Sequence, residues 1–296
     1  MNLHSIVRPE VVVAALLSLA PMFGAAFFPS RIGTLEKKLP RVLFLLSPSF
    51  LCVPYALVAQ SFGILRWNWL ALYALLPVAV AVVLSQARNA DPAQKGDWRD
   101  FLVLIVLGLA VDLRWMEPAW PPGLTALGKM LLLDAGICGF LAVRQLEGVG
   151  FDLRLRLRDT GIGLREFCFY APIAIFLGLS VRFLHFHATW PDPLPALGAY
   201  VFTFLFIAIP EELYFRGWLQ NLLERRIGRT AALAATAVLF GLAHWNKQTT
   251  SFNWQYILLA ALAGIFYGRA WRADRRVGAS AVTHATVDTL WSLWFR

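Results

Sequence analysis

Apolar runs recur along the whole chain, each of roughly 17 to 25 residues, the length that an α-helix needs to cross a bilayer. Hydrophobic residues make up 58% of the sequence and charged residues only 15%, and the mean hydropathy is +0.60. In lipid, helices satisfy every backbone polar group within one segment. The pattern therefore predicts an all-α fold, a polytopic transmembrane bundle of about 8 to 10 spans.

The predicted spans alternate with short polar connections, and the charge of these connections predicts an orientation. Most of the 27 Lys and Arg residues fall in one set of alternate connections. Basic loops favour the cytoplasmic side, so both termini are predicted to lie outside, across a plasma membrane or a bacterial inner membrane. We place the spans near residues 11–28, 42–61, 67–87, 101–118, 124–143, 167–184, 197–222, 230–246, 254–270 and 279–295.

The net charge of +9 is compatible with nucleic acid or with an anionic lipid surface. Because the basic residues lie in short loops between spans, they are placed to face the anionic cytoplasmic leaflet. We therefore expect membrane lipids as partners and no nucleic acid.

Ionisable residues inside apolar segments are costly, and each is a hypothesis for a functional site. In this chain they gather between residues 197 and 296, whereas the helices of 1–196 have no role that the sequence assigns. They form three groups: Glu211, Glu212 and Arg216; His244; and His284 with Asp288.

The first group follows Pro210, which removes a backbone hydrogen bond and can kink the helix. Glu212 and Arg216 are spaced i, i+4 and meet on one helix face. This pairing leaves Glu211 free to face a cavity, where it suits a general base acting on water. The alternative is a Glu–Arg pair that only fixes helix packing.

The two histidines lie on later spans. His284 and Asp288 share a helix face at i, i+4, which could be a local hydrogen bond alone. His244 stands about 20 Å from the inner end of its span and could be a packing residue. Straight helices would not bring it to Glu211, so a shared site requires a tilted or kinked helix.

Three motifs occur in order: PEELYFRG, FGLAH and HATVD. They resemble the EExxxR, FxxxH and HxxxN or HxxxD motifs of the CPBP family, the CAAX-prenyl-protease-type and bacteriocin-immunity-type intramembrane proteases. The resemblance covers roughly the last third of the chain. It implies a peptidase that hydrolyses a membrane-associated peptide or protein, lipidated substrates included, in a cavity open to the cytosol.

The resemblance also implies a role for each matching residue. Glu211 and His244 would position and deprotonate the attacking water, and Glu212 with Arg216 would hold that arrangement. His284 and Asp288 would complete the site, facing the substrate carbonyl from the opposite helix. An Asn at the last position can donate to an oxyanion and a carboxylate cannot, so Asp288 better fits a role in orienting His284.

The cofactor is either none or a divalent metal such as zinc. The side chains of Glu211, His244, His284 and Asp288 are zinc ligands by type, but no HExxH spacing is present. Relatives by this resemblance include metalloproteases and glutamate-dependent proteases, and we favour the metal-independent mechanism.

Two other functions are compatible with the same residues. A proton-coupled transporter would use the acids and histidines as an ion path, and a catalytically silent membrane scaffold or chaperone would retain them for structure. Independently, Gly264 and Gly268 form a GxxxG pattern that permits close packing of their helix on a neighbour.

Overall fold

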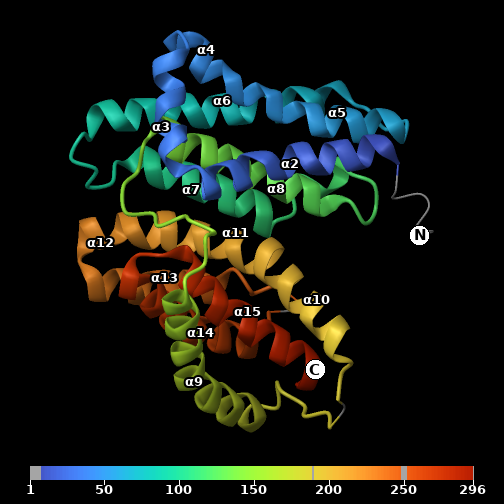
Figure 1. Ribbon diagram of the computed structural model, residues 1–296, viewed down its shortest axis with the longest axis vertical. Coiled ribbons are helices and arrows are strands. Elements are labelled where there is room, and N and C mark those ends of the chain that lie inside the picture. The colour runs from blue at the N-terminus through green and yellow to red at the C-terminus, as the bar shows by residue number, and fades with distance from the viewer. Residues whose placement is uncertain (1–7, 189, 248–251, 296) are drawn as a thin grey trace. The chain divides into compact units, whose positions relative to one another are not determined.

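A computed structural model describes residues 8–188, 190–247 and 252–295. These residues form helices and connecting turns, with no strand among them (Figure 1). The predicted all-α fold is confirmed. The chain divides into two compact units, Met1–Glu147 and Gly148–Arg296, referred to below as the N-terminal and C-terminal units. The sequence predicts that the protease-like segment begins at residue 197, and this boundary stays a prediction.

The N-terminal unit is held together by an aromatic cluster. The rings of Tyr55 and Tyr73 lie 5.1 Å apart, and both contact Trp120 edge to face. The indole of Trp120 donates to the Tyr73 hydroxyl at 2.6 Å. The helices of this unit are α2 (Pro9–Phe27), α3 (Pro29–Lys38), α4 (Arg41–Leu46), η1 (Ser47–Leu51), α5 (Cys52–Ser61), α6 (Trp67–Ala90), α7 (Trp98–Asp112), η2 (Glu117–Ala119), α8 (Thr125–Ile137) and the π-helical η3 (Cys138–Val143).

In the C-terminal unit, α14 lies at the centre and packs against α9, α13 and α15. The helices of this unit are α9 (Leu157–Ser180), α10 (Pro193–Thr203), η4 (Phe204–Ala208), α11 (Ile209–Glu212), η5 (Leu213–Gln220), α12 (Asn221–Ile227), α13 (Arg229–Leu242), α14 (Trp254–Asp274) and α15 (Val277–Trp294). Both η4 and η5 are π-helical.

Six segments of the described chain are long and apolar enough to cross a membrane, which makes this an integral multi-pass membrane protein. The other four predicted spans correspond to α7, α13, α14 and α15. Of these, α7 and α13 have only 15 and 14 residues. The six segments are Pro9–Phe27, Arg41–Ser61, Trp67–Ala90, Thr125–Val143, Leu157–Ser180 and Pro193–Ile227.

The GxxxG glycines place α14 close to its neighbours, as their pattern predicts. A methyl group at Gly264 would lie 3.0 Å from the Ala237 Cα of α13, and one at Gly268 would overlap the Leu233 Cδ1. Helix α13 contributes a glycine to the same contact, because a methyl group at Gly241 would lie 2.6 Å from a backbone oxygen of α14. The backbones of α13 and α14 therefore approach through small residues.

A charged cluster fixes the start of α15 beside the start of α9. The Nε atom of Arg276 donates to the Asp159 carboxylate at 2.9 Å, and its Nη1 lies 3.2 Å from an oxygen of Asp152. Burial alone would raise the pKa of Asp152, but hydrogen bonds from Arg154 and Arg276 outweigh it and lower that pKa to about 2. The cluster sets the register in which α15 carries its polar residues to the site.

Candidate active site

The first motif lies on a helix of unusual geometry. Residues Glu211 and Glu212 belong to the short helix α11, which is flanked on both sides by the π-helical segments η4 and η5. Pro210 stands at the start of α11 and has no N–H to donate. Such π-helical segments re-aim side chains and are frequent at functional sites.

Glu212 is the hub of a fully buried hydrogen-bond network. Two Arg216 nitrogens lie 3.2 Å from its carboxylate oxygens, as the i, i+4 spacing predicts. The Nδ1 atom of His284 donates to Oε1 at 2.8 Å, and the Ser280 hydroxyl contacts Oε2. Arg216 also donates to the Gly264 carbonyl oxygen at 3.0 Å. The network thus ties the first motif to α14 and α15.

Glu211 occupies the more open side of the site, and 26% of its side chain is exposed. Its Oε1 lies 3.6 Å from the Lys247 ammonium, and its Oε2 lies 4.0 Å from Nε2 of His284. No described residue donates a hydrogen bond to Oε2. This buried oxygen is therefore an acceptor without a donor among the described residues.

His284 is held on both edges and on one face. Its Nε2 lies 3.4 Å from the Asp288 carboxylate, as the i, i+4 spacing predicts, while its Nδ1 is held by Glu212. The ring of Tyr267 stacks on the imidazole, with centroids 4.7 Å apart. These contacts fix the orientation of the imidazole ring, so that its Nε2 faces both Asp288 and Glu211.

His244 reaches the same region through Phe240, the other residue of its motif. The Phe240 ring lies 4.9 Å from the His244 ring and 5.7 Å from the His284 ring, centroid to centroid. Nδ1 of His244 donates to the Phe240 carbonyl oxygen at 2.8 Å, so Nε2 of the neutral ring is an acceptor. The depth mismatch expected for straight helices does not separate the two histidines.

An apolar cavity of about 130 Å³ lies beside these polar groups. Its polar wall is formed by His244, His284 and Asp288, and the remainder is mainly aromatic and aliphatic, with Tyr170 and Trp291 among the largest residues. The site therefore combines carboxylate and imidazole side chains with space for an apolar group.

A comparison with protein families classifies the segment that carries these side chains. Residues 193–290 match the family described as Type II CAAX prenyl endopeptidase Rce1-like. These residues form an Rce1-like domain. The domain begins with α10, ends within α15 and contains all three motifs. The comparisons with curated proteins and with solved structures found no match to this chain.

Helix α9 completes the cavity although it lies outside the Rce1-like domain. It packs against α14 and α15 and supplies Phe167, Tyr170 and Ala174 to the lining. The Tyr170 hydroxyl donates to the Leu259 carbonyl oxygen at 2.9 Å, which fixes α9 on α14. The cavity is thus built from the Rce1-like domain together with α9 and with residues beyond both, at Phe183, Leu184, Trp291 and Phe295.

Sequence reasoning missed two residues of the site in the Rce1-like domain. Lys247 lies three residues after His244, and Ser280 lies one helical turn before His284. Ser280 could have been found from its i, i+4 spacing to His284, which places both on one face. Lys247 gave a weaker signal, because it follows the end of a predicted span, where a lysine is commonly an interfacial residue.

The side chains of the Rce1-like domain do not fit a divalent metal in this arrangement. Among the described residues, no group of three or more His, Cys, Asp or Glu side chains converges as a metal site. The candidate ligand Glu211 already faces the Lys247 ammonium at 3.6 Å, and a dication would stand beside that positive charge. We derive no step through a metal.

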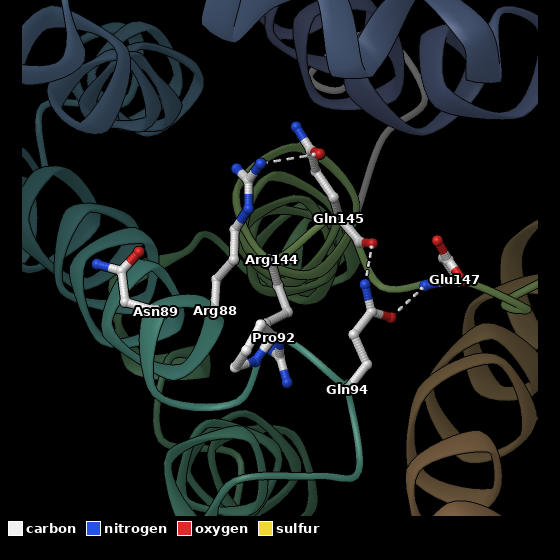
Figure 2. Close-up of a pocket in the computed structure, with 7 residues that line it drawn as sticks. All are labelled: Arg88, Asn89, Pro92, Gln94, Arg144, Gln145 and Glu147. Carbon is white, nitrogen blue, oxygen red and sulfur yellow. Dashed lines mark hydrogen bonds between the residues drawn. The ribbon is translucent and has the colours of Figure 1, made fainter.

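The N-terminal unit holds a separate polar pocket of about 430 Å³ (Figure 2). The Arg144 guanidinium in its wall is fully buried and pairs with Asp100 at 2.9 Å and Asp91 at 2.8 Å. Arg88 pairs with Glu36 at 2.7 Å. Since carboxylates of the same unit compensate both guanidinium groups, we assign them to holding the fold. The pocket is lined by Arg88, Asn89, Pro92, Gln94, Arg144, Gln145 and Glu147.

Proposed function

We propose that this protein is an intramembrane endopeptidase that hydrolyses a peptide bond of a membrane-associated or lipidated peptide or protein. The observation that carries the proposal is the position of Glu211. Its Oε2 has no donor among the described residues and faces His284 at 4.0 Å, inside an Rce1-like domain and near an apolar cavity. A carboxylate oxygen without a donor keeps the lone pairs that a general base requires.

In the proposed reaction, Glu211 takes a proton from a water molecule, and Nε2 of His244 accepts a second hydrogen bond from that water. The water oxygen attacks the scissile carbonyl carbon, and the C=O electron pair moves to oxygen. When the carbonyl re-forms, the C–N bond breaks and the proton on Glu211 passes to the departing amine. Each proton is therefore returned, and the residues end the cycle unchanged.

The remaining motif residues act as positioning residues in this proposal. Glu212 and Arg216 form the buried network that holds His284 at Nδ1, and Asp288 orients the same ring at Nε2. Fixed side chains maintain a reactive geometry that free rotation would lose. The apolar cavity would take an apolar or lipidated part of the substrate.

We also propose that the basic loops face the cytosol and that both termini lie outside. This orientation follows from the distribution of Lys and Arg between alternate connections. Thiol labelling of single-cysteine variants at loop positions, applied from each side of sealed vesicles, checks it.

Cleavage of a quenched-fluorescent peptide library, with prenylated C-terminal peptides included, tests the proposed activity. We expect Glu211→Gln to lower kcat by roughly 10² to 10⁴-fold, because an amide cannot accept the water proton. Glu10→Gln, which changes an exposed carboxylate of α2, is the matched control and should cleave like the wild type. We expect a chelator to leave cleavage unchanged. Equal activity of the wild type and Glu211→Gln would contradict the proposal and favour a scaffold.

A further inference from the structure

Lys247 is held against the active site by hydrogen bonds of its own backbone. Its N–H donates to the His244 carbonyl oxygen at 3.3 Å, and its carbonyl oxygen accepts from the Asn253 side chain at 3.3 Å. Asn253 in turn caps α14, because its Oδ1 accepts from the N–H of Tyr256 at 3.1 Å. The lysine backbone is thus fixed to α14, the helix at the centre of the C-terminal unit.

The Lys247 side chain lies on the accessible side of Glu211. Its ammonium is 3.6 Å from Oε1 of Glu211, while the other oxygen of that carboxylate faces His284. With 37% of its side chain exposed, the lysine keeps freedom to move when a substrate enters. It is therefore a cation within one side-chain movement of the position where the water attacks.

Two other described donors near Glu211, Arg216 and His284, are already paired with carboxylates. Arg216 is fully buried and is engaged by Glu212 and by the Gly264 carbonyl oxygen. Nε2 of His284 lies 3.4 Å from Asp288. An oxyanion that forms here would stand near the Glu211 and Asp288 side chains, so it requires a nearby cation.

We propose that Lys247 is a catalytic residue that stabilises the oxyanion of the tetrahedral intermediate, an inference that rests on the proposed peptidase function. In the resting enzyme its ammonium pairs with Glu211. When the water attacks, Glu211 gains a proton and the carbonyl oxygen gains the negative charge, so the ammonium finds its charge partner on the substrate. As the C–N bond breaks, the carbonyl re-forms, the proton leaves Glu211 for the amine, and the resting pair returns.

This proposed role distinguishes Lys247 from a residue that only binds the substrate. The attraction to the carbonyl oxygen arises only as the transition state forms, so its loss lowers kcat and leaves KM nearly unchanged. It also predicts a specific rescue. Asp288→Asn introduces an amide donor near His284, and this donor can take over part of the task in a protein that lacks the lysine.

The test uses the purified full-length protein and one peptide that the wild type cleaves. We expect Lys247→Met to lower kcat by about 10² to 10³-fold and Lys247→Arg to recover most of the rate. Adding Asp288→Asn to Lys247→Met should raise kcat by roughly tenfold. Lys129→Met is the matched control, since Lys129 forms a half-exposed ion pair with Glu117 at 3.2 Å in the other unit and should not affect cleavage.

Three results overturn the role of Lys247 while the protease proposal stands: wild-type kcat for Lys247→Met, a change confined to KM, or no rescue by Asp288→Asn. In each case Glu211→Gln remains inactive. If Glu211→Gln cleaves like the wild type, both the protease proposal and the role of Lys247 are wrong.

Discussion

At the residue scale, the two adjacent glutamates of the first motif have different surroundings. Glu212 is fully buried, and Arg216, Ser280 and His284 occupy its oxygens. Glu211 is partly exposed and keeps one oxygen without a donor among the described residues. Adjacent residues point about 100° apart on a helix, so one chain segment supplies an anchored carboxylate and a partly exposed one.

Removal of the Ser280 hydroxyl tests the anchoring role of Glu212. We expect Ser280→Ala to lower kcat by roughly tenfold, because a buried carboxylate oxygen that loses its donor costs about 1–3 kcal/mol. Thr286→Ala is the control, since that hydroxyl donates to Val282 of its own helix. Steady-state kinetics and thermal unfolding of both variants check the prediction. Equal kcat values for the two variants would contradict it.

At the element scale, short and irregular helices bring together motif residues that straight spans would hold apart. The two glutamates of the first motif lie between two π-helical segments, and the second motif runs across the end of a helix of only 14 residues. Small residues then allow α13 and α14 to pack closely, which brings Phe240 into contact with both histidines. The position of each motif residue along the membrane normal therefore depends on helix packing as well as on sequence position.

A methyl group between α13 and α14 tests this packing. We expect Gly241→Ala to lower the free energy of unfolding by about 1–3 kcal/mol, because the added Cβ would lie 2.6 Å from the Ile257 carbonyl oxygen. The control is Gly161→Ala in α9, where no atom lies within 4 Å and the helix gains stability. Thermal unfolding in detergent measures both. A Gly241→Ala protein as stable as the wild type would show that the helices separate at little cost.

At the scale of the whole molecule, each unit buries its own charged network. The N-terminal unit encloses Arg144 with Asp91 and Asp100, and the C-terminal unit encloses Glu212 with Arg216. Breaking a buried pair leaves an uncompensated charge, whereas an exposed pair contributes little. The two networks differ in their surroundings, because the second stands next to the partly exposed carboxylate of Glu211 and an apolar cavity.

Arg144→Met tests the structural assignment of the N-terminal pocket. We expect it to lower the free energy of unfolding by about 3–5 kcal/mol, because the fully buried Asp100 loses its charge partner. Arg99→Met is the control: its pair with Asp97 is partly exposed and should contribute about 0–1 kcal/mol. The melting temperatures of the two variants measure this difference in stability. A normal melting temperature for Arg144→Met would mean that the guanidinium is free to serve a ligand.

The sequence alone determined the helical membrane fold, the three motifs and the two i, i+4 pairs, because apolar run length and helical spacing are local properties of a chain. Only the tertiary structure decided which groups meet. Lys247 reaches Glu211 from a turn after α13, Ser280 reaches Glu212 from α15, and α9 closes the cavity from outside the Rce1-like domain. Such contacts depend on helix packing between residues far apart in the chain, and no local pattern records that packing.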